Sequence, residues 1–136
     1  MELRKVSANG RVTGGELGAA IVAAVKEYTD AVSKAVAHEV DETATLVKKE
    51  IADNSPKKRG RYKKGWAIQK RDSDGVTSRI VYNRSHSGLV HLLENGHAKA
   101  TGGRVAAIPH VRPVADARSA EMYENIKRIV ETGGQR

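Results

Sequence analysis

The sequence predicts an α+β fold in which a long N-terminal helix packs on a small antiparallel sheet, made of a hairpin plus a further strand, with a C-terminal helix. Three observations carry this prediction: a helical apolar stripe uninterrupted by proline, two strand-like runs around a turn sequence, and a second helical segment after a late proline. A chain of 136 residues can bury one sizeable core, so we expect residues 1–136 to form a single domain.

The long helix is expected over Glu16–Ala52, where the only glycine lies near the start. Thr13 and Glu16 have the spacing of a capping box, and Asn54-Ser55-Pro56 would end the helix. About 37 residues at roughly 1.5 Å each would span about 55 Å, which exceeds the diameter of a small domain. Part of the apolar stripe is therefore expected to face another subunit. The stripe comprises Leu17, Ile21, Val25, Tyr28, Val32, Val36, Val40, Thr43, Val47 and Ile51, and its inter-subunit part is expected at Val25, Val32, Val36 and Val40.

A hairpin is expected next, because Trp66–Arg71 and Val76–Asn83 flank a turn sequence that contains Asp74-Gly75. Alternation along each strand sets the two faces of this hairpin. Trp66 and Ile68 would share one face, and Val76, Ile80 and Tyr82 would also share a face.

The short apolar run Leu89–Glu94 is expected to form one or two helical turns, closed by a left-handed cap at Asn95-Gly96. Lys99–Arg104 would be an exposed glycine-containing loop, and Val105–Ile108 would return as the further strand. Pro113 would begin the C-terminal helix, which is expected to reach Glu131. Its inward residues are expected to be Val114, Met122, Ile126 and Ile129, with Gly133 beyond its end. Residues 1–15 are expected as a flexible or extended arm, residues 97–104 as a mobile loop, and residues 132–136 as a flexible tail.

The net charge of +8 is concentrated in one stretch. Residues 53–71 carry 8 basic and 1 acidic side chains, a net +7, and include the sequence SPKKRGRYKKGW at 55–66. Such a stretch fits either a solvated turn or an arm that contacts nucleic-acid phosphates and stacks bases on Tyr62 and Trp66. Its place between a helix and a hairpin favours the turn, with Trp66 as the first buried residue of a strand. The cations that would form a DNA-facing patch are Lys57, Lys58, Arg59, Arg61, Lys63 and Lys64.

The residue types that carry chemistry lack the required spacing. No cysteine is present, which excludes disulfides and thiolate metal sites and favours an intracellular product. The N-terminus lacks an apolar signal region, and no run is long enough to span a membrane. Ser85 and Ser87 lie beside His86 without a nucleophile elbow, and Gly102-Gly103-Arg104 is not in the register of a phosphate loop. The five histidines, His38, His86, His91, His97 and His110, do not have metal-ligand spacing. We therefore expect no catalytic residue, no metal and no cofactor.

The segment Leu89–Asp116, LVHLLENGHAKATGGRVAAIPHVRPVAD, resembles the tail-component, or neck, family of lambdoid-type long-tailed phages. The resemblance runs from about Glu16 to Glu131 and rests on the order and spacing of several weak motifs. The matching residues are Pro56, Gly60, Trp66, Leu93, Glu94, Gly96, Pro109, Arg112 and Pro113. Three positions depart from the family pattern: Arg59 replaces a usual threonine, Asn95 a common aromatic residue, and His110 a frequent phenylalanine.

The resemblance implies a structural virion protein without catalytic residues, which completes the tail or joins head and tail as a ring of six or twelve copies. Its partners would be other neck and tail proteins and, non-specifically, passing DNA, without a membrane. It would act at the top of the tail after assembly in the host cytoplasm. The exposed loop would dock through Lys99, Thr101, Gly102, Gly103 and Arg104. A small basic nucleic-acid-binding protein that uses residues 55–66 is the alternative, and an RNase-like toxin or metal-dependent nuclease is a third hypothesis.

Overall fold

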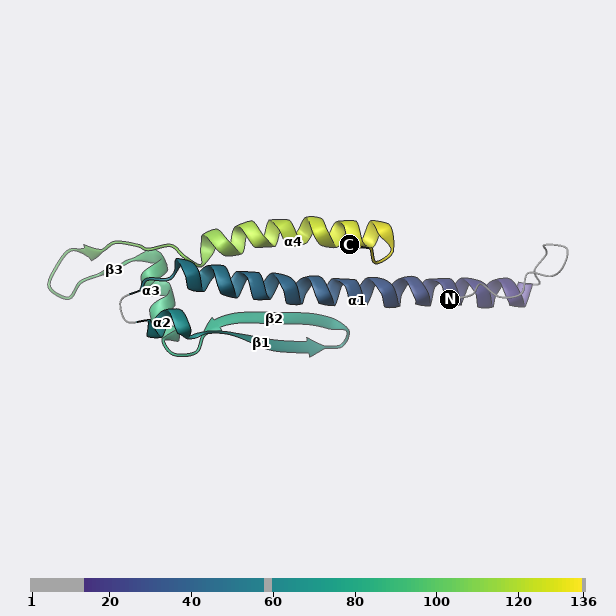
Figure 1. Ribbon diagram of the computed structural model, residues 1–136, viewed down its shortest axis with the longest axis horizontal. Coiled ribbons are helices and arrows are strands. Elements are labelled where there is room, and N and C mark those ends of the chain that lie inside the picture. Colours follow the sequence, from purple (N-terminus) through teal and green to yellow (C-terminus); the bar gives the residue numbers. More distant parts are fainter. Residues whose placement is uncertain (1–13, 58–59, 136) are drawn as a thin grey trace. The chain divides into compact units, whose positions relative to one another are not determined.

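The computed structural model describes residues 14–57 and 60–135 (Figure 1). The chain divides into two compact units, one made of Met1–Ala37 with Asn125–Arg136 and the other of His38–Glu124. The helices α1 (Gly14–Asn54) and α4 (Arg112–Thr132) contribute residues to both units. The mixture of helices with small antiparallel sheets confirms the predicted α+β fold.

Helix α1 extends the predicted segment by two residues at each end. Its expected stop is confirmed, because the Ser55 hydroxyl donates to the Ile51 carbonyl at 2.6 Å and its backbone N–H donates to Ala52. Thr13, the expected cap at the other end, lies outside the described residues. No helix in the described part of the chain is both long and apolar enough to cross a membrane.

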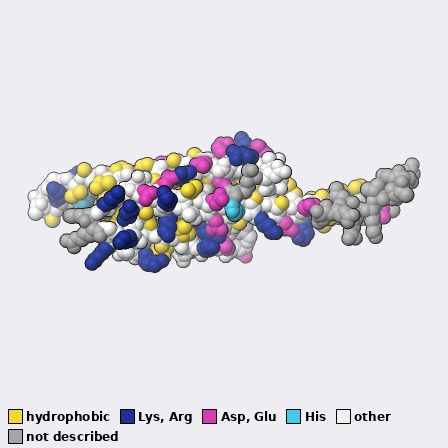
Figure 2. All heavy atoms as spheres, in the orientation of Figure 1, with side chains coloured by type: hydrophobic (Ala, Val, Ile, Leu, Met, Phe, Trp, Pro, Cys, Tyr) yellow, Lys and Arg dark blue, Asp and Glu magenta, His cyan; other side chains and the backbone are white. Residues whose placement is uncertain are grey.

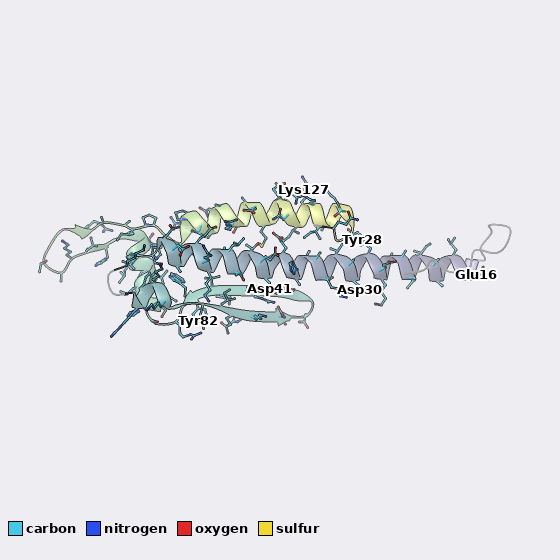
Figure 3. The ribbon with its side chains drawn as sticks, viewed as in Figure 1. Glu16, Tyr28, Asp30, Asp41, Tyr82 and Lys127 are labelled. Carbon is cyan, nitrogen blue, oxygen red and sulfur yellow. The ribbon has the colours of Figure 1, made fainter. Side chains whose placement is uncertain are left out.

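The first unit, from Met1–Ala37 and Asn125–Arg136, pairs the N-terminal part of α1 with the last turns of α4. The Tyr28 hydroxyl donates to the Val130 carbonyl at 2.7 Å, and Figure 3 shows Tyr28 directed from α1 toward α4. The Gly134 backbone comes so close to α1 that an added Cβ would lie 3.0 Å from the Ala31 carbonyl group. Ile129 is buried in this unit, as predicted, whereas Leu17, Ile21 and Val25 are exposed.

The second unit, His38–Glu124, contains the hairpin β1 (Trp66–Ser73) and β2 (Val76–Asn83). The turn has two residues, Asp74 and Gly75, both with positive φ, so β1 runs two residues further than expected. Trp66 pairs with Asn83 and Ile68 with Val81, which places these four residues on one face. Val76, Ile80 and Tyr82 share the opposite face and are exposed, so the predicted division of faces is confirmed.

The core of the second unit joins α1, the hairpin and the start of α4. Its buried members are Ile51, Tyr62, Trp66 and Val114, surrounded by the partly buried Val47, Ala52, Val81, Val90, Leu93 and Val111. The Trp66 indole N–H donates to the Ser55 hydroxyl at 2.9 Å, and its side chain is buried. Trp66 is therefore the first buried residue of the strand, as the sequence indicated, and does not offer its ring to solvent.

The prediction that Val105–Ile108 joins the hairpin was wrong. Only β4 (Arg104–Val105) forms there, and it pairs with β3 (His97–Ala98) in a separate two-stranded sheet. The chain leaves the ladder because the Ile108 N–H donates to the Leu93 carbonyl, and Pro109 has no N–H to offer. These two strands also take in the ends of the expected mobile loop, which leaves residues 99–103 between them.

The remaining short elements are helical. The basic segment contains α2 (Arg61–Lys64), where the sequence indicated only a turn. The run before Gly96 forms η1 (Ser87–Leu89) and α3 (Val90–Asn95), which confirms the predicted helical turns. Gly96 has φ 69° but ψ 176°, so it is not the expected left-handed cap. Helix α4 begins one residue before Pro113 and ends one residue after Glu131.

Candidate functional site

A buried polar cluster lies where α2, α3 and the start of α4 meet in the second unit. The Tyr62 hydroxyl is 2.6 Å from His110 Nε2, and His110 Nδ1 lies 2.7 Å from the Ile108 carbonyl and 2.9 Å from Glu94 Oε1. Both neighbours of Nδ1 are acceptors, so Nδ1 carries a proton, and in the neutral ring Nε2 accepts the Tyr62 hydroxyl. The His110 side chain is fully buried.

Glu94 caps the first turn of α4. Its Oε1 accepts the backbone N–H groups of His110 and Val111 at 2.6 and 2.7 Å, and its Oε2 accepts that of Arg112 at 3.0 Å. Burial acts to raise the pKa of Glu94, but these three backbone hydrogen bonds and the nearby His110 together outweigh it and hold the pKa below its ordinary value. Glu94 is therefore an ionised cap that joins α3 to the N-terminus of α4.

Tyr62, His110 and Glu94 have the residue types of a catalytic nucleophile, base and acid. Their electrostatic environment does not favour catalysis. Burial, followed by the charge of Glu94, raises the pKa of Tyr62 to about 12. The hydroxyl therefore stays neutral and is a poor nucleophile near neutral pH. The three side chains Tyr62, Glu94 and His110 act as a structural junction. In the described part of the chain, no three His, Asp or Glu side chains are placed to hold a metal ion.

The residues of the family resemblance lie mostly around this junction. Leu93 packs against the core, and Gly96 approaches the chain after β4 so closely that an added Cβ would lie 2.5 Å from the Val105 carbonyl oxygen. Gly60 has φ 76° and precedes α2. Pro109, Arg112 and Pro113 are exposed at the start of α4, and Pro56 is half-buried. Sequence reasoning identified Glu94 but not its partners Tyr62 and His110.

A second junction is organised by Asn83, which is buried at the end of β2. Its Nδ2 donates to the Tyr62 carbonyl at 2.7 Å, and its Oδ1 accepts the backbone N–H groups of Ser85 and His86. Gly65 packs against this turn, where a Cβ would lie 2.6 Å from both Asn83 Oδ1 and Ser85 Oγ. Close approach, not an unusual φ, thus requires glycine at position 65.

The basic segment surrounds α2. Lys57, Arg61 and Lys64 are exposed and Lys63 is half-buried, whereas Lys58 and Arg59 lie outside the described residues. Figure 2 shows Lys and Arg side chains gathered in the region of α2 and the adjoining hairpin. Lys48 from α1 and Arg84 from the turn after β2 join Lys64 around a depression of about 480 Å³. No local sequence pattern predicts that these three cations, which are far apart in the chain, would meet.

An arginine of the hairpin forms ion pairs with α1 and with β1. The Arg79 side chain is buried and donates to Asp41 and Asp72, each at 2.6 Å. These hydrogen bonds lower the pKa values of both carboxyl groups. Figure 3 shows Asp41 on α1 and Tyr82 on the hairpin. A similar pair, Arg118 with Glu50, joins α4 to α1.

The expected inter-subunit valines are not equivalent. Val25 is exposed at 59 %, and its neighbours are exposed too, Leu17 at 49 %, Ile21 at 54 % and Val22 at 68 %. Val32, Val36 and Val40 are half-buried within the chain. The loop residues Lys99, Thr101, Gly102, Gly103 and Arg104 are all exposed.

An apolar pocket of about 370 Å³ opens beside α2 and α3. Its lining includes Pro56, Tyr62, Leu89, Leu93 and Ile108. Leu89 and Ile108 are exposed at 41 and 45 %, so the pocket presents apolar surface to solvent.

Residues 19–96 match the model of the family described as "Bacteriophage HK97-gp10, putative tail-component". The matched range holds most of α1, the basic segment, the hairpin and α3 with Glu94. It covers more than half of the chain and ends before Pro109. Comparisons with curated proteins and with solved structures gave no match.

Proposed function

Since this chain belongs to the HK97-gp10-like family of bacteriophage tail components, we propose that it is a structural virion protein that completes the tail and joins it to the head. Its mechanism is assembly into a closed ring at the top of the tail. The observation that supports assembly is the apolar face of α1 formed by Leu17, Ile21, Val22 and Val25. Contiguous exposed apolar side chains of this kind are typical of protein–protein contacts.

The ring contact joins two different surfaces. The α1 face of one copy packs into the apolar pocket beside α2 and α3 of the next copy, where Leu89 and Ile108 are exposed. A contact between two unlike patches repeats head-to-tail, and it closes into a ring when its rotation permits. The family resemblance supports six or twelve copies. The exposed loop at Lys99–Arg104 would dock onto neighbouring neck or tail proteins, after assembly in the host cytoplasm.

We propose no catalytic role. The three side chains that most resemble catalytic machinery, Tyr62, Glu94 and His110, satisfy one another and the backbone of α4. They hold the α2, α3 and α4 segments in register, which is what an assembly surface built from short elements requires.

The test substitutes aspartate for an exposed valine of the α1 face. Val22→Asp and Val25→Asp should leave the far-ultraviolet circular dichroism unchanged and abolish rings in mass measurements and electron micrographs. Val76→Asp is the matched control, because Val76 is 64 % exposed on the hairpin and lies outside the proposed contact. Val32 and Val36 are unsuitable, since they are half-buried and their substitution would perturb folding. Intact rings in the Val22 and Val25 variants would contradict the proposed contact.

A small basic nucleic-acid-binding protein is the second candidate function, favoured by the exposed Lys57, Arg61 and Lys64. The same mass measurement distinguishes the ring-forming tail component from the nucleic-acid-binding protein. A protein that remains a monomer at high concentration and binds duplex DNA tightly would favour this second function over the ring.

A further inference from the structure

The depression bordered by Lys48, Lys64 and Arg84 is formed by three segments of the second unit. Lys48 comes from α1, Lys64 ends α2, and Arg84 with Ser85 follows β2. The floor is backbone and side chain of the first residues of β1. Its volume of about 480 Å³ has room for a phosphate group and the sugar atoms attached to it.

The backbone around the depression is held in place by hydrogen bonds. The Arg84 N–H donates to the Gly65 carbonyl at 2.7 Å, and Asn83 binds both the end of α2 and the backbone of Ser85. The absence of a Cβ at Gly65 lets the turn after β2 pack directly on α2. The cations therefore extend from fixed backbone positions, which lowers the entropy lost when they bind an anion.

The three cations of the depression have no ion-pair partner in the described part of the chain. Among the described residues, no carboxylate forms an ion pair with Lys48, Lys64 or Arg84, although Lys26, Lys49, Arg79 and Arg118 all have one. Three like charges around one concavity repel each other and concentrate a positive potential there. An anion bound between them would relieve this repulsion.

We propose that this depression binds phosphate groups of the nucleic-acid backbone. The Arg84 guanidinium can donate two parallel hydrogen bonds to one phosphate, the two lysines act as point charges, and the Ser85 hydroxyl is a further donor. The binding is independent of base sequence and does not depend on ring formation.

Two features favour a nucleic acid over an acidic protein segment. The segment that supplies Lys64 also carries the exposed Lys57 and Arg61, and repeated cations suit a ligand with regularly repeated charge. The apolar residues that line the depression offer little surface, because Trp66 and Ala67 are buried, and its polar lining is Lys48, Lys64, Arg84 and Ser85. An acidic peptide would also be expected to bury apolar side chains in a partner.

The experiment measures the anisotropy of a short fluorescent DNA duplex with the intact protein between about 50 and 200 mM salt. The test variant is K48A/K64A/R84A, and the control K34A/K127A/R128A removes the same charge from exposed positions elsewhere. Three lost phosphate contacts should make the slope of log affinity against log salt shallower by roughly 2 to 3 and weaken binding at least about tenfold. The control should change the affinity by less than about threefold, as expected for charges that do not contact the bound phosphates.

Competition identifies the ligand. Polyglutamate and inorganic phosphate are each added against the duplex at equal ionic strength, and neither should displace it at concentrations where unlabelled duplex does. Displacement by polyglutamate would assign the depression to an acidic protein partner, and displacement by phosphate would assign it to a free anion. Either result, or equal loss of affinity in test and control variants, overturns the proposal. Ring formation, measured on the same variants, should be unchanged, which separates this proposal from the proposed function.

Discussion

Replacing Glu94 by glutamine tests the junction between α3 and α4 with the smallest change in shape. The carboxylate accepts three backbone N–H groups, from His110, Val111 and Arg112, at 2.6 to 3.0 Å. Glutamine has one oxygen and one NH₂ group, so at least one of the three backbone N–H groups loses its acceptor. The remaining N–H groups donate to a neutral amide oxygen in place of a charged carboxylate. A buried donor without an acceptor costs about 1–3 kcal/mol, and loss of a helix cap typically costs about 1 kcal/mol. We expect Glu94→Gln to lower the free energy of unfolding by about 2–4 kcal/mol.

Thermal and urea unfolding followed by circular dichroism measure this loss. With an unfolding entropy of about 2.1 cal/mol/K per residue, a loss of about 3 kcal/mol should lower the melting temperature by roughly 10 °C. Glu124→Gln is the matched control, because it makes the same chemical change on an exposed residue of α4. Its melting temperature should stay within about 2 °C of the original, as for most surface substitutions.

The pH dependence distinguishes the charge of Glu94 from its shape. The pKa of Glu94 is lowered below its ordinary value of 4.5 in the folded protein, so its ionisation stabilises the fold above that value. This contribution is lost as the pH falls through the folded pKa. The difference in free energy of unfolding between the original protein and Glu94→Gln should therefore be largest near about pH 7 and smaller near about pH 3. An equal difference at both pH values, or no difference from Glu124→Gln, would refute the capping role.

Three further predictions concern packing and docking. Gly96→Ala should cost more than about 2 kcal/mol, because its φ is 69° and the new Cβ would lie 2.5 Å from a carbonyl oxygen, whereas Gly88→Ala has open space and should cost much less. Ile51→Ala, in the buried core, should lower the free energy of unfolding measured in urea by about 2–5 kcal/mol. Leu46→Ala should lower it clearly less, because Leu46 is 40 % exposed. Deleting Thr101–Gly103 leaves two residues between β3 and β4, a length that hairpins accept, so folding should be retained. Head–tail joining in an assembly assay should be weakened, and normal joining would show that this loop is only a connector.

The sequence predicted those elements that are specified by local patterns. The limits of α1 were predicted to within two residues at each end. This was possible because the apolar periodicity is long and Pro56 follows the end of the helix. The hairpin was recognisable from Asp74-Gly75, the residues that a two-residue turn with positive φ requires. The partner of β4 was not recognisable, since alternation shows that a segment can be a strand and not which strand it joins. The decisive contact, from Ile108 to Leu93, is a single backbone hydrogen bond.

The candidate sites depend on contacts between residues far apart in the chain. Glu94 was singled out by its motif, but nothing local indicates that it would bind the backbone at 110–112 or stand beside His110. Tyr62 and His110 are separated by 48 residues and meet only because α2 and the start of α4 pack on the same core. The charge of the basic segment was evident, whereas the contribution of Lys48 and Arg84 requires the folded structure.

The scarcity of large apolar residues explains why polar junctions carry so much of this fold. Aromatic residues make up 4% of the chain and phenylalanine is absent, and among the described residues the buried core cluster of the second unit has four members. The short elements reach this core through few side chains, Tyr62 from α2 and Val90 and Leu93 from α3. Glu94, Asn83 and Ser55 supply the missing constraints through hydrogen bonds to backbone groups or to Trp66. Because hydrogen bonds are directional, they fix the short elements relative to each other more strictly than a few apolar contacts would. The apolar pocket and the cationic depression both lie among these elements, so each proposed interaction surface depends on a junction that the protein itself supplies.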